Sequence, residues 1–169
     1  MKCFNESQIK KCEISKPDFS KRNYNIIHND DIFGTIEEDQ DKGTLASLTT
    51  AKGSYTIKRC GFFNPYITIR KKNFETNESI AFLNLRSETT ITIDGNLFTF
   101  KLLNLWKNQW CWTNEKHQVL ITIKPIIAGT IKGDIEISKE AFHYTQLELL
   151  TLIGAYFMIK YQNETDFVQ

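Results

Sequence analysis

The sequence has few residues that break or link a chain, since its 169 residues include only 8 glycines and 3 prolines. Low-complexity linkers and collagen-like repeats are therefore excluded, and we interpret residues 1–169 as a single domain. An excess of one charge is also absent, because 21 Lys and Arg residues stand against 20 Asp and Glu residues. Proteins that bind nucleic acid through their overall charge are usually much more basic, so we do not expect a nucleic acid partner.

Targeting and redox motifs are missing as well. The N-terminal region lacks the apolar run that follows the basic residues of a secretory signal peptide. The four cysteines form no Cys-x-x-Cys pair, which argues against a zinc site or a redox dithiol. They are Cys3, Cys12, Cys60 and Cys111. We therefore expect reduced thiols and a cytoplasmic protein without a metal or a cofactor.

Sequence motifs of common enzymes are not found either. The chain has no P-loop, no GxSxG and no GxGxxG, and none of its three histidines sits in an HxxxH or HExxH frame. We therefore name no catalytic residues and expect a non-catalytic protein.

Short alternating segments separated by turn residues extend from about residue 9 to residue 137, with the period of β-strands. The clearest is the hairpin 89–101, where Asp94-Gly95 supplies the positive φ angles of a type I′ turn. Pairing across that turn places Ile91 opposite Phe98 on the more apolar face. Further strands are predicted at 24–28, 32–36, 54–59, 66–70, 80–85, 109–113, 118–123 and 130–137. Roughly ten strands at this spacing predict a sandwich or a barrel.

The pattern becomes helical near the C-terminus. Thr145-Gln-Leu-Glu148 has the spacing of a capping box, and the helix is predicted to run over about 146–161. Its apolar residues lie on nearly every side, so it must be buried in protein or in a bilayer. The uncharged stretch between Glu148 and Lys160 is about 16 Å long, whereas a bilayer core is about 30 Å thick. We therefore do not expect transmembrane insertion.

These patterns together predict a mainly β protein, with a closed barrel or highly curved antiparallel sheet around a hydrophobic C-terminal central helix. The barrel and the helix would occupy about residues 20–162, with 1–19 and 163–169 at the periphery. Gly154 and Ala155 would allow a strand to approach the helix closely.

Three segments resemble the tubby C-terminal-like superfamily, which includes the LURP-one-related proteins and the phospholipid scramblases. They are 105–113 with its tryptophans, Gly133-Asp-Ile-Glu-Ile137, and the apolar segment 147–159. The resemblance is one of architecture over about residues 20–162, and it is greatest to small bacterial members. It implies a closed barrel of about twelve strands threaded by the helix. Tubby proteins bind phosphoinositide headgroups in a basic cavity, but those basic positions have no match here residue by residue.

The densest group of basic and aromatic residues lies in the predicted hairpin 58–72. We expect its cations near one end of the hairpin and its aromatic residues at the turn, where an anionic lipid headgroup could bind. The candidate ligand-binding residues are Arg59, Arg70, Lys71, Lys72, Phe62, Phe63 and Tyr66. The alternative is a solvated hairpin whose aromatic residues cover the end of the barrel. We thus expect an intracellular binding or scaffold domain, with an anionic lipid or a protein as partner, and with a cytoplasmic or peripheral membrane location.

Two other functions remain open from the sequence. In the first, 147–159 forms a short bilayer segment that anchors the protein to a membrane. In the second, the barrel is an enzyme that uses the acidic stretch 30–41, because paired carboxylates can hydrolyse glycosides or bind a hard cation. The acidic residues are Asp30, Asp31, Glu37, Glu38, Asp39 and Asp41.

The tryptophans Trp106, Trp110 and Trp112 would share one face of a regular strand. We interpret them as core packing, with a pocket that stacks on a sugar ring as the alternative.

Overall fold

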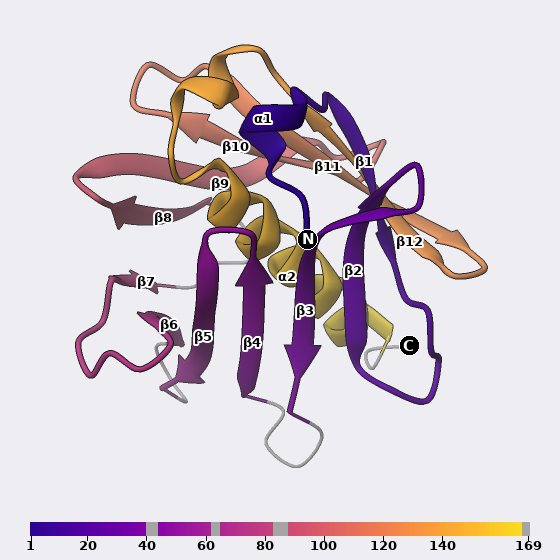
Figure 1. The fold of residues 1–169 in the computed structure, drawn as a ribbon, viewed down its shortest axis with the longest axis horizontal. Helices are drawn as coiled ribbons and strands as arrows, with labels where there is room; N and C mark the ends of the chain where they lie inside the picture. The colour runs from indigo at the N-terminus through magenta and orange to yellow at the C-terminus, as the bar shows by residue number, and fades with distance from the viewer. Residues whose placement is uncertain (40–43, 62–64, 83–87, 167–169) are drawn as a thin grey trace.

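The computed structural model of the chain describes residues 1–39, 44–61, 65–82 and 88–166. These residues form one antiparallel sheet of twelve strands that curves around a C-terminal helix (Figure 1). The strands are β1 (Lys11–Ser15), β2 (Asn23–His28), β3 (Asp31–Glu38), β4 (Leu45–Thr50), β5 (Gly53–Cys60), β6 (Tyr66–Lys71), β7 (Ser79–Phe82), β8 (Glu88–Ile93), β9 (Asn96–Asn104), β10 (Gln109–Asn114), β11 (Val119–Ala128) and β12 (Ile131–Ile137). The helices are α1 (Phe4–Ser7), the 3-10 turn η1 (Glu140–His143) and α2 (Leu147–Asp166).

The sheet is nearly closed into a barrel. Its strand order is β7-β6-β5-β4-β3-β2-β1-β12-β11-β10-β9-β8, so β1 and β12 from opposite ends of the chain pair in the middle. The two edge strands, β7 and β8, approach one another on the side of the helix opposite β1 and β12 (Figure 1). The predicted mainly β architecture around a central helix is therefore confirmed.

The predicted hairpin around Asp94-Gly95 is confirmed in its turn and its register. Asp94 and Gly95 have φ angles of 50° and 78°, as a type I′ turn requires. Ile91 pairs with Phe98, and both side chains face the core.

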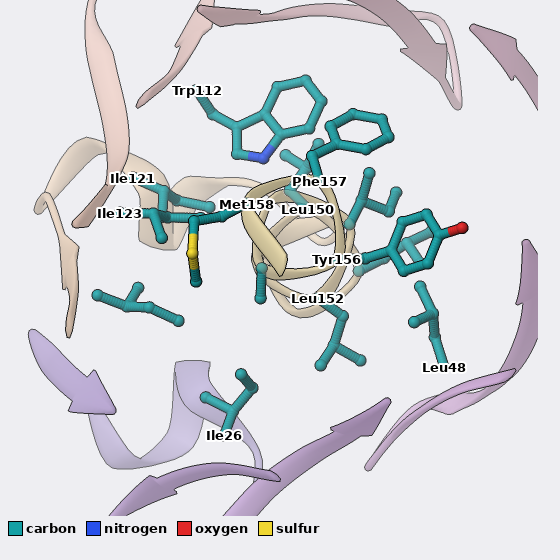
Figure 2. Close-up of a cluster of buried hydrophobic side chains, with 14 of the residues drawn as sticks. Ile26, Leu48, Trp112, Ile121, Ile123, Leu150, Leu152, Tyr156, Phe157 and Met158 are labelled. Atoms are coloured by element: carbon teal, nitrogen blue, oxygen red, sulfur yellow. The ribbon is translucent and has the colours of Figure 1, made fainter. Parts of the chain in front are cut away.

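Helix α2 fills the interior of the barrel. Every residue from Gln146 to Ile159 is buried, and the helix ends at Asp166 rather than near residue 161. Figure 2 views α2 along its axis, with Trp112, Ile121 and Ile123 on one side of the helix. Leu152 of α2 extends from another side, between Ile26 and Leu48. Because strands surround the helix, residues 146–159 have no apolar face that could contact a bilayer. This packing argues against the short bilayer segment considered from the sequence. Within the described ranges, no helix combines the length and the apolarity needed to cross a membrane.

Two glycines set the distance between the sheet and α2. A Cβ at Gly154 would lie 2.6 Å from Ile123 Cδ1 and 2.6 Å from Trp112 Nε1. On the sheet side, a Cβ at Gly34 of β3 would lie 2.8 Å from a methyl group of Leu152. The prediction that Gly154 permits a close approach is therefore confirmed.

The N-terminal segment is not peripheral, and the boundary predicted at residue 19 is wrong. Strand β1 pairs with both β2 and β12, and Ile14 is fully buried in the core. Phe4 of α1 is fully buried as well, with its ring 5.1 Å from that of Phe33. These segments, together with β4, were missed because each is short and mixes polar residues with few apolar ones.

The capping box predicted at Thr145 is replaced by tertiary contacts. The carboxylate of Glu148 does not turn back to the residue before the helix, because its Oε1 accepts from Cys3 Sγ at 2.7 Å and from the Phe4 amide at 3.3 Å. The first turn of α2 is therefore tied to the N-terminal segment of the chain.

The antiparallel order divides the connections between the two ends of the barrel. At the helix-N end, where α2 begins, Gln146 donates a hydrogen bond to Asp94 in the β8–β9 turn. At the helix-C end, the ring of Tyr161 lies 4.9 Å from that of Trp110, next to the β9–β10 turn. The β1–β2, β9–β10 and β11–β12 connections all lie at this helix-C end.

Candidate functional site

The basic residues predicted to gather at one hairpin end lie at opposite ends of the barrel. Arg59 pairs with Ile67 near the helix-C end, whereas Lys71 pairs with Tyr55 near the helix-N end. Four strand residues, or about 13 Å, separate Ile67 from Lys71. The prediction of one basic cluster is therefore wrong, because cations on two antiparallel strands meet only when the register places them opposite each other.

The cations at the helix-N end make separate local contacts. Arg70 Nε donates to Asn77 Oδ1 at 2.7 Å, and Lys71 Nζ lies 5.7 Å from the ring centre of Phe74. Lys72 is exposed at the end of the same strand.

The predicted aromatic residues of the hairpin divide into two groups. Phe62 and Phe63 lie outside the described residues. Tyr66 is at the helix-C end, with its ring 6.0 Å from that of the exposed Phe82.

The acidic stretch also fails to form one site. Asp30 and Asp31 lie at the β2–β3 turn, while Glu37 and Glu38 lie at the other end of β3. Asp31 pairs with Lys2, whereas Glu38 is buried and pairs with Lys160. Asp41 lies outside the described residues. Because the two groups are about 20 Å apart along the strand, they cannot act as one carboxylate pair.

The three tryptophans have two different environments. Trp110 and Trp112 are buried against Phe100, as core packing predicts. Trp106 is 98% exposed, because residues 105–108 form a turn and do not continue the strand. The alternation assumed from the sequence was therefore wrong at Trp106.

The β9–β10 turn is held by hydrogen bonds that leave its apolar residues outside. Asn104 Oδ1 accepts from the Lys107 amide at 3.1 Å, and the Asn108 amide donates to the Leu105 carbonyl at 3.1 Å. Asn108 has φ 46° and accepts a 3.2 Å bond from Trp110 Nε1. Leu105 is 75% exposed beside Trp106. The turn therefore holds two large apolar side chains in solvent.

The β1–β2 connection presents a third exposed apolar residue. Asp18 accepts hydrogen bonds from both the hydroxyl and the amide of Ser20. These two hydrogen bonds close a local turn around Phe19. These two bonds hold the pKa of Asp18 below its usual value, with a smaller contribution from Lys21. Phe19 is 60% exposed, and Lys132 Nζ lies 5.1 Å from the centre of its ring.

These connections are neighbours in space. The Lys16 amide donates to the Thr130 carbonyl at 2.7 Å and joins the β1–β2 and β11–β12 connections. Trp110 pairs with Ile123 of β11, so the β9–β10 turn lies beside the last part of that strand. We name residues 16–22, 105–108 and 129–132 the three-loop surface.

The charges of the three-loop surface are mainly positive. Its only carboxylate is Asp18, which lies 3.5 Å from the ammonium group of Lys21. Its cations are Lys16, Lys21, Arg22, Lys107 and Lys132. The surface therefore combines exposed apolar side chains with a net positive charge.

Comparisons with known proteins identify no relative. No protein-family model matches the chain, and neither a curated protein nor a solved structure matches it significantly. The resemblance to the tubby C-terminal-like superfamily remains a prediction.

Proposed function

We propose that this protein is a non-catalytic binding module that docks its three-loop surface on an anionic membrane. The observation that carries the proposal is the nearly complete exposure of Trp106 beside Leu105 on a turn fixed by hydrogen bonds. On this proposal the protein is cytoplasmic and peripheral to the membrane.

The apolar residues of the surface suit the interface between headgroups and acyl chains. Tryptophan is enriched at that depth because its ring is largely apolar while its N–H remains available for a hydrogen bond. Burying a large apolar side chain contributes about 1.5–3 kcal/mol. Because the turn is already ordered, inserting Trp106 and Leu105 would cost little conformational entropy.

The cations of the surface favour anionic over neutral lipid. A Lys or Arg near such a membrane contributes about 1 kcal/mol, and salt screens this attraction. Lys107 adjoins Trp106 in the chain, and Lys132 lies over Phe19, so charge and apolar contact would act at the same place.

Co-sedimentation with vesicles tests the proposal. Vesicles of phosphatidylcholine with phosphatidylserine should bind the protein at low salt, whereas pure phosphatidylcholine or high salt should abolish binding. Trp106→Ser should weaken binding about tenfold or more, by the free energy of its apolar burial. Lys107→Glu combined with Lys132→Glu should remove the preference for anionic vesicles.

Matched controls exist at the opposite end of the barrel. Phe74→Ser removes an exposed aromatic residue at the helix-N end, and Lys72→Glu reverses an exposed charge there. Both should bind vesicles like the wild type. Equal binding by Trp106→Ser and the wild type, or no vesicle binding at all, would refute the proposal.

A further inference from the structure

A second polar site lies at the helix-N end, away from the three-loop surface. A cavity of about 200 Å³ opens between the start of α2, the β4–β5 turn and the β8–β9 turn. Its charged lining residues are Lys52, Lys71, Glu78, Asp94 and Glu148. Carboxylates therefore outnumber ammonium groups around the cavity.

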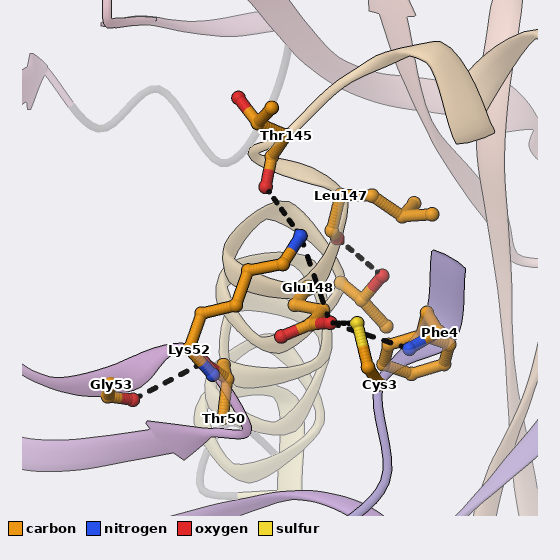
Figure 3. Close-up of polar contacts among 9 residues, drawn as sticks. Cys3, Phe4, Thr50, Lys52, Gly53, Thr145, Leu147 and Glu148 are labelled. Carbon is orange, nitrogen blue, oxygen red and sulfur yellow. Dashed lines mark hydrogen bonds and ion pairs between the residues drawn. The ribbon is translucent and has the colours of Figure 1, made fainter. Parts of the chain in front are cut away.

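Glu148 is the most unusual of these residues. It is 1% exposed, and among the described residues only one of its two carboxylate oxygens has hydrogen-bond partners. Oε1 accepts from Cys3 and from the Phe4 amide, and Lys52 Nζ lies 3.8 Å away. Figure 3 shows this oxygen facing these three groups, while the other oxygen, Oε2, points away from them. A buried carboxylate oxygen without a donor costs free energy, so it is a place where a donor would bind well.

The residues around Glu148 leave this oxygen unsatisfied. Lys52 Nζ donates to the Thr145 carbonyl at 3.1 Å on the Oε1 side. Asp94 is engaged by Gln146 at 2.7 Å, and the Lys71 ammonium lies over Phe74. None of these groups makes a hydrogen bond to Oε2.

The electrostatic environment of the cavity favours a positive ligand. Burial raises the pKa of Tyr55, and the negative charges of Glu78, Asp94 and Glu148 raise it further. A cation near the Tyr55 ring would be stabilised by these carboxylates and by the ring face. Among the described residues, no group of three or more His, Cys, Asp or Glu side chains is placed to hold a metal ion. An organic cation therefore fits better than a metal.

We infer that this cavity binds a small primary ammonium group, which donates a hydrogen bond to Oε2 of Glu148. The alkyl part of the ligand would contact Ile93 and Leu149, which line the same cavity. This inference is independent of the membrane proposal, because the two sites lie at opposite ends of the barrel.

Titration with n-butylammonium tests the inference. Binding is monitored by the amide chemical shifts in NMR spectra of the protein. The wild type should show saturable shifts at Tyr55, Ile93 and Leu149, whereas n-butanol and butyrate should not bind. Glu148→Gln keeps an oxygen that can accept from Cys3 and Phe4 but removes the charge, and it should weaken binding at least tenfold. Glu78→Gln changes an exposed side chain that lines the cavity, and it should weaken binding several-fold.

Glu115→Gln is the matched control, since Glu115 is exposed at the same end but outside this cavity. It should bind like the wild type. The inference would be overturned if n-butanol bound as tightly as n-butylammonium, or if Glu78→Gln and Glu148→Gln both bound n-butylammonium like the wild type. It would also be overturned if the wild type showed no shifts at the cavity. Trp106→Ser should leave the titration unchanged, so failure here is distinguishable from failure of the membrane proposal.

Discussion

At the scale of single residues, glycine sets the packing between α2 and strands β10 and β11. Intrinsic propensity disfavours glycine inside a helix by about 1 kcal/mol relative to alanine. Gly154 is nevertheless suited to its place, because the side chains of Trp112 and Ile123 occupy the space of its missing Cβ. Tertiary packing therefore outweighs helix propensity at this position.

Gly154→Ala should accordingly lower the free energy of unfolding by about 1–3 kcal/mol, because the added methyl overpacks the core. Helix propensity alone predicts the opposite sign, so urea unfolding separates the two effects. Ile123→Val removes the Cδ1 atom nearest to the new methyl and should recover part of the loss in the double variant. A rise in stability for Gly154→Ala would contradict the packing described here.

At the scale of elements, a buried ion pair joins β3 to the last part of α2. Lys160 Nζ lies 2.7 Å from Glu38 Oε2, and the two side chains are 16% and 1% exposed. Lys160 also lies 5.5 Å from the ring centre of Tyr156. The pair fixes α2 against the sheet at the helix-C end, where the apolar face of the helix ends.

Lys160→Met should destabilise the protein by about 3–5 kcal/mol, because it leaves the Glu38 carboxylate buried without its partner. The double variant Glu38→Gln with Lys160→Met should be more stable than Lys160→Met alone, since no charge is then stranded. The exposed pair of Lys11 and Glu136 is the control, and Lys11→Met should change stability by about 0–1 kcal/mol. Denaturant unfolding of the four proteins checks this, and a Lys160→Met variant as stable as Lys11→Met would disprove it.

At the scale of the whole molecule, the sheet and α2 share one hydrophobic core. That core includes residues from every strand and from both ends of the chain, and α2 lies at its centre. The barrel cannot keep its interior filled without the helix, and the helix alone would expose apolar residues on all sides. We therefore expect one cooperative unfolding transition, with coincident curves from tryptophan fluorescence and circular dichroism.

Ile153→Asp should abolish that transition, because it places an unpaired charge at a fully buried position on α2. The matched control is Ile80→Asp, a half-exposed isoleucine on β7, which should remain folded. Circular dichroism and thermal unfolding of both variants provide the measurement. A folded Ile153→Asp protein would contradict the central position of the helix.

Local sequence patterns determined the features whose causes are themselves local. The alternation of residues and the Asp94-Gly95 turn specify the β8–β9 hairpin, because turn type and side-chain period are set by neighbouring residues. The apolar circumference and short length of 147–159 likewise specified a helix buried in protein.

Only the tertiary structure decided which segments meet. It placed Arg59 and Lys71 at opposite ends of the barrel, paired β1 with β12, and turned Glu148 from a capping role toward Cys3. It also excluded Trp106 from the core. These outcomes depend on strand register and on contacts between residues far apart in the chain, which short sequence patterns do not encode.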